Sequence, residues 1–110
     1  MSSVTMLQAY IDAMIWADVD DKFKGYTIDP SLLESSKTDC ELFLEEIQEY
    51  IDENFDYEAA GHDFWLTRNH HGAGFWDGDW KHGEELTKIA HQYGSVTLFP
   101  CSREEVIYGQ

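Results

Sequence analysis

Between residues 38 and 56, apolar residues recur at helical spacing and acidic residues fill most of the other positions. This pattern predicts an amphipathic helix, because residues three and four apart share one face. Thr38 followed by Glu41 matches a capping box and places the start of the helix at Thr38. The apolar stripe consists of Cys40, Phe43, Leu44, Ile47, Tyr50, Ile51 and Phe55. The opposite face has no Lys or Arg, and we expect it to be exposed.

Two further helices are predicted from the same periodicity. One covers about residues 4–18, with Ser3 as its N-cap. The other covers about residues 83–93, with Gly94 placed for a left-handed C-terminal cap. Pro30 is expected to open only a short helical turn.

Two hairpins complete the predicted fold. Residues 62–69 and 73–77 are rich in aromatics and flank a short loop, and residues 95–99 and 105–108 form a second pair. The sequence thus predicts a single α+β domain over residues 1–110, with three helices on a small antiparallel sheet of two hairpins. The expected core consists of Leu7, Ile11, Phe43, Ile47, Ile51, Trp65, Trp76, Leu86 and Ile89.

The overall charge restricts the partners of such a chain. The formal net charge is −15, from 22 acidic against 7 basic side chains. Direct binding to nucleic acid is not expected, because contacts to phosphates need cationic groups. No apolar run is long enough for a membrane span and no secretory signal is present, which predicts a cytoplasmic protein. Cys40 and Cys101 are expected to be free thiols, as in reducing compartments.

The segment from Gly61 to Asp77, GHDFWLTRNHHGAGFWD, is dense in tryptophan and histidine. It resembles a stretch in small tailed-bacteriophage proteins that carry a GHDFWLTRNxHGxGFWD core. The resemblance covers residues 61–77 only and implies a phage origin, and hence the cytoplasm of a host cell. It implies no chemistry, because that family comes without an assigned activity.

Several polar residues of this segment are candidates for a site. Arg68 is expected to pair with Asp63 or Asp77; alternatively, Arg68, Asn69 and His71 form an anion or polar site. Histidine and carboxylate are common metal ligands, so a predicted hairpin that brings His62 near His71 would offer a metal site. Their spacing matches no closed coordination pattern, and we expect no tight metal there.

No catalytic residue is predicted. The chain has neither a GxSxG elbow nor a glycine-rich phosphate loop, and its carboxylates lie where nothing would shift their pKa. The sequence therefore favours a binding protein without a cofactor over an enzyme. A small metal-dependent enzyme centred on the histidines, or a structural component of a virion, are the alternatives.

The acidic face of the helix from Thr38 is the predicted binding surface. Its residues are Glu41, Glu45, Glu46, Glu49, Asp52 and Glu53. Glutamates at i, i+4 would repeat every ~6 Å along a helix, close to the ~7 Å between phosphates on one strand. We therefore expect an inhibitor that occupies a basic, nucleic-acid-binding surface of a host protein, as an anti-defence DNA mimic does. The alternative is a face that is only solvated.

Overall fold

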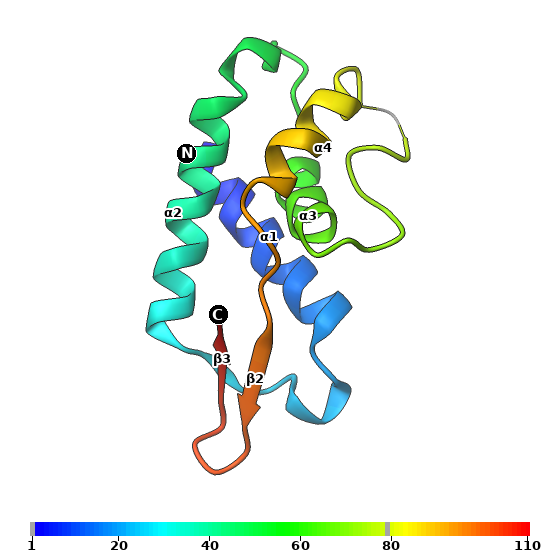
Figure 1. The fold of residues 1–110 in the computed structure, drawn as a ribbon. Coiled ribbons are helices and arrows are strands. Elements are labelled where there is room, and N and C mark those ends of the chain that lie inside the picture. Colours follow the sequence, from blue (N-terminus) through cyan, green and yellow to red (C-terminus); the bar gives the residue numbers. More distant parts are fainter. Residues whose placement is uncertain (1, 79) are drawn as a thin grey trace.

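The computed structural model describes residues 2–78 and 80–110, and within them the chain forms four α-helices and one three-stranded sheet. The helices are α1 (Ser2–Asp18), α2 (Pro30–Glu46), α3 (Tyr57–Arg68) and α4 (Gly83–His91). The strands are β1 (Thr27–Ile28), β2 (Leu98–Cys101) and β3 (Val106–Gly109). Two 3₁₀ turns, η1 (Asp21–Phe23) and η2 (Gln48–Tyr50), follow α1 and α2. In Figure 1, α2 runs along one side and the β2–β3 hairpin stands at the end away from α4.

The predicted sheet of two antiparallel hairpins is wrong. The strand order is β1-β3-β2, with β2 antiparallel to β3 and β1 parallel to β3. The C-terminal hairpin exists close to its predicted place, since Leu98 pairs with Gly109 and Cys101 with Val106. The parallel edge strand β1 consists of only two residues, so it has no alternation that a sequence pattern could reveal.

Helix α2 begins eight residues before the predicted start, which is therefore wrong. The true N-cap is Asp29, whose side chain accepts a hydrogen bond from the Leu32 amide, and Pro30 follows at the first helical position. The helix ends at Glu46 instead of continuing to residue 56. Beyond it, the side chains of Asp52 and Asp56 accept hydrogen bonds from the backbone amides of Asn54 and Ala59. Such local hydrogen bonds compete with helix continuation.

The predicted hairpin over residues 62–77 is also wrong. Residues 62–68 lie in α3, and residues 73–77 belong to the connection between α3 and α4. Phe64, Trp65, Leu66, Thr67 and Arg68 are all buried, so the last part of α3 is covered on every side. A helix without an exposed face shows no helical period, and its aromatic residues favour a strand prediction.

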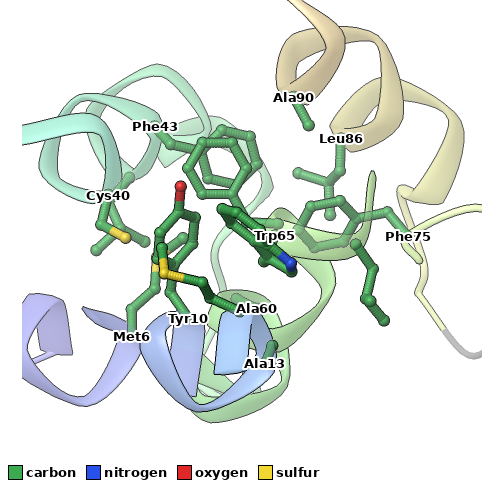
Figure 2. Packing of buried hydrophobic residues seen from close by; sticks show 14 of the residues in the cluster. Met6, Tyr10, Ala13, Cys40, Phe43, Ala60, Trp65, Phe75, Leu86 and Ala90 are labelled. Carbon is green, nitrogen blue, oxygen red and sulfur yellow. The ribbon is translucent and has the colours of Figure 1, made fainter. Parts of the chain in front are cut away.

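Helix α1 lies against α3 over most of its length. The closest approach is at Gly61, where a Cβ atom would lie 2.1 Å from the carbonyl oxygen of Met6. Phe43 of α2 stacks on Phe64 with ring centroids 4.2 Å apart, and Tyr10 meets Trp65 edge to face. Figure 2 shows Trp65 in the middle of this cluster, between the side chains of α1, α2 and α4.

The predicted core is largely confirmed. Phe43, Ile47, Trp65 and Leu86 are fully buried. The partly buried members that pack against them are Leu7, Ile11, Ile51 and Ile89. Trp76 is an exception, because it is 55% exposed in the connection after α3. Within the described residues, no helix is long and apolar enough to cross a membrane.

Replacement of Ile47 by Ala is expected to lower the free energy of unfolding by about 2–5 kcal/mol, because the side chain is fully buried where α2 ends. Urea unfolding measures the change. The matched control is Leu42→Ala on the same helix, where the side chain is 45% exposed and the expected change is within about 0.5 kcal/mol. Equal stability of the two variants would contradict this core.

Candidate functional site

The six acidic residues predicted to bind a partner are all exposed, and we call them the acidic surface. Glu41, Glu45 and Glu46 lie on the last turns of α2, Glu49 lies in η2, and Asp52 and Glu53 follow it. Because α2 ends at Glu46, the expected single row of four glutamates along one helix is wrong. Only Glu41 and Glu45 keep the i, i+4 relation on α2.

Basic side chains are scarce in this part of the sequence. Arg68 is the one Lys or Arg between Lys37 and Lys81 in the sequence, and it is only 3% exposed. The exposed charged residues of the described stretch 38–78 are therefore acidic, apart from its histidines. Such a surface attracts cations and basic partners over distances set by salt screening.

Arg68 directs its guanidinium group into the protein. Its Nη1 donates hydrogen bonds to Tyr10 Oη (3.0 Å) and Asp39 Oδ2 (2.8 Å). Its Nε and Nη2 donate to the carbonyl oxygens of Gly94 (2.8 Å) and Tyr93 (2.9 Å). The charged partner is thus Asp39 of α2, and the predicted partners Asp63 and Asp77 are wrong. Four of the five guanidinium N–H donors are engaged within the fold.

The other two residues of the predicted anion site, Asn69 and His71, also make side-chain contacts within the fold. Asn69 donates from Nδ2 to the Trp65 carbonyl oxygen and accepts the Val96 amide at Oδ1. His71 Nε2 lies 2.9 Å from Asp18 Oδ2, which also accepts a hydrogen bond from Trp65 Nε1 at 2.6 Å. These contacts connect the end of α3 to α1 and to the chain after α4.

The structure does not bring the metal candidates His62 and His71 into one group. His62 Nδ1 lies 3.3 Å from Asp63 Oδ1, whereas His71 contacts Asp18. Over residues 2–78 and 80–110, no three His, Cys, Asp or Glu side chains are grouped so that they could hold a metal ion.

The cysteines are both free, as expected. Cys40 is fully buried, and burial first, then the neighbouring Asp39 carboxylate, raises the pKa of its thiol to about 12. The thiolate is the nucleophilic form, so Cys40 is an inert core residue at neutral pH.

A pocket of about 620 Å³ opens next to the acidic surface, and we call it the Trp80 pocket. It is formed by residues 50–56, by the first turns of α3, and by the connection from residue 74 together with the first turn of α4. Its lining combines aromatic rings with four carboxylates. The residues are Tyr50, Asp52, Asn54, Phe55, Asp56, Ala59, Asp63, Gly74, Asp77, Gly78, Trp80, Lys81, His82 and Leu86.

One hydrogen bond fixes the central ring of the pocket. Trp80 Nε1 donates to Asp63 Oδ2 at 2.6 Å. The Trp80 ring lies 5.4 Å from Phe55 and 5.2 Å from buried Phe75, and Tyr50 lies 4.9 Å from His82. Asp52, the residue shared with the acidic surface, joins the two features.

Sequence reasoning missed the Trp80 pocket. Asp63 and Trp80 are 17 residues apart, and the pocket depends on the turn of the chain between them. The sequence indicated only the two segments that meet, because aromatic residues lie next to acidic ones at 55–56 and 76–80.

Comparisons with known proteins do not help to interpret this geometry. No protein-family model, curated protein or solved structure matches the chain. The acidic surface and the Trp80 pocket are therefore the features that indicate a function.

Replacement of Asp39 by Ala is expected to lower the free energy of unfolding by about 1–3 kcal/mol, because it removes the charged acceptor of buried Arg68. Denaturant unfolding at low salt measures the change. Glu41→Ala removes an exposed carboxylate two residues further along α2 and should change stability by less than about 0.5 kcal/mol. If both variants lost the same stability, the pair with Arg68 would not be the cause.

Alkylation tests the two thiols. At about pH 9, iodoacetamide should modify Cys101 and spare Cys40, because the raised pKa keeps the folded Cys40 thiol neutral. Mass spectrometry counts the modified sites, with Cys40→Ser and Cys101→Ser as references. In denaturant both thiols should react. Rapid modification of Cys40 in the folded protein would contradict its burial.

Proposed function

We propose that this protein binds a basic surface of a partner protein through its acidic surface and thereby inhibits that partner. The observation that supports the proposal most strongly is the inward position of Arg68. It removes the one Lys or Arg of residues 38–78 from the surface, so no Lys or Arg of this stretch offsets its exposed carboxylates. Complementary charge increases the rate of association and selects a basic partner over others.

The chemistry of the surface favours a protein partner over a nucleic acid. Carboxylates repel phosphates, and contacts to phosphates require Lys or Arg on the exposed side. A basic protein surface presents the required cations. The resemblance of residues 61–77 to phage proteins supports a partner from a bacterial host.

The positions of the glutamates fit a surface with a charge complementary to a basic partner. They fit less well a surface that copies the phosphate spacing of a nucleic-acid strand. Glu41 and Glu45 are one helical step apart on α2, but Glu49 and Glu53 follow after the helix has ended. A partner that normally binds nucleic acid remains a member of the proposed class, since its surface is basic. The proposal does not require a regular phosphate-like repeat.

The test is a variant in which Glu41, Glu45, Glu49 and Glu53 are replaced by Gln. Exposed ion pairs contribute about 0.2–1 kcal/mol each, so binding should weaken by about 1–4 kcal/mol in total. The melting temperature should rise slightly, because the Glu41–Glu45 repulsion on α2 costs about 0.2–0.5 kcal/mol. Wild type and variant are immobilised and exposed to a bacterial lysate, and bound proteins are identified by mass spectrometry at rising salt concentration.

The control changes the charge by the same amount elsewhere. It carries Asp21→Asn, Glu34→Gln, Glu104→Gln and Glu105→Gln. All four residues are exposed, and they lie in η1, near the start of α2 and in the β2–β3 turn. We expect wild type and the control to capture the same basic protein, which salt then elutes. The first variant should fail to capture it. Equal capture by the folded first variant would refute the proposal.

A further inference from the structure

We propose that the Trp80 pocket binds an arginine side chain of the partner and so anchors it beside the acidic surface. This inference rests on the proposed function and names the chemical group that the partner inserts. The volume of about 620 Å³ lies within the range of pockets that enclose a small ligand or one side chain.

The walls of the pocket suit a flat cation. The Trp80 indole is held at its edge by Asp63, so its position does not depend on a ligand. Phe55 lies 5.4 Å from it at 53°, and Tyr50 lines the same pocket against His82. Aromatic faces attract guanidinium and ammonium groups, most strongly when water is excluded.

The charge of the pocket selects a cation over a neutral group. Asp52, Asp56, Asp63 and Asp77 line it, against a single lysine, Lys81. The hydrogen bonds that the described structure gives to Asp52, Asp56 and Asp77 use Oδ1 of each carboxylate, from backbone amides. Each carboxylate has about four acceptor sites, so one amide contact leaves capacity for a ligand's N–H groups.

Arginine fits this combination better than lysine. Its planar guanidinium stacks on an aromatic face and at the same time donates in its plane to more than one carboxylate. A lysine ammonium is a strongly hydrated point charge that lacks the stacking surface. The lining of the Trp80 pocket contains both aromatic rings and carboxylates.

The experiment follows the indole N–H signal of Trp80 in the ¹⁵N-labelled protein, assigned with Trp80→Phe. The probe is N-acetyl-arginine-N-methylamide. A saturable shift of the Trp80 signal that weakens with added salt is expected. The citrulline analogue, which has the same shape without the charge, should cause no shift, and the lysine analogue should bind more weakly than the arginine probe.

Two variants and one control keep the result specific. Phe55→Leu removes an aromatic wall and should weaken arginine binding about two- to fivefold. Asp52→Asn should also weaken it, and its amide oxygen can still accept the Asn54 amide. The control is Phe99→Leu on β2, where the ring is 49% exposed and does not line the pocket, and binding should be unchanged. Spectral dispersion confirms that each variant is folded.

The outcomes separate this inference from the proposed function. The arginine site would be overturned by any one of three results. The citrulline probe shifts the Trp80 signal as much as the arginine probe does, the lysine probe binds as tightly as the arginine probe, or neither Phe55→Leu nor Asp52→Asn weakens binding. The proposed function would still stand if the glutamine variant lost its captured partner. Suppose instead that the arginine probe binds specifically while the glutamine variant still captures the same partner as wild type. That result would refute the role of the acidic surface and leave the arginine site intact.

Discussion

Arg68 donates four hydrogen bonds that connect α3 to α1, to α2 and to the turn after α4. A buried guanidinium requires acceptors on every side, so Tyr10, Asp39 and the carbonyl groups of residues 93 and 94 are fixed relative to one another. The same burial has a consequence outside the core. Because the cation faces inward, no Lys or Arg between residues 38 and 78 offsets the exposed carboxylates at the end of α2, in η2 and in the segment after it.

The elements that sequence reasoning predicted are those with one buried and one exposed side. Helices α1 and α4 keep a water-exposed face, so their apolar residues show helical spacing, and their bounds differ little from prediction. Gly94 after α4 has the predicted left-handed conformation, with φ of 76°. The C-terminal hairpin was predictable because its strands are next to each other in sequence and joined by a short turn.

The missed features depend on contacts between distant residues. Helix α3 is buried around Phe64–Arg68, which removes the periodicity that identifies a helix, and its aromatic content indicated a strand. The pairing of Arg68 with Asp39 crosses 29 residues, and that of Trp80 with Asp63 crosses 17, so neither has a local signature. The acidic residues of the site were identified from their pattern along the predicted helix, whereas the pocket beside them requires the folded chain. The proposed binding mode depends on that pocket, since charge alone attracts many partners and a shaped pocket selects a group.

We infer that the surface formed by residues 41–63 is negative, because the one Lys or Arg between residues 38 and 78, Arg68, is buried. Amide proton relaxation by soluble nitroxides tests this directly, with a cationic and an anionic probe of matched shape. We predict that the cationic probe relaxes the amides of residues 41–63 far more than the anionic probe does, with the largest ratio at Asp52 to Asp63, and that added salt reduces the ratio. Equal relaxation by the two probes over these residues would contradict the account.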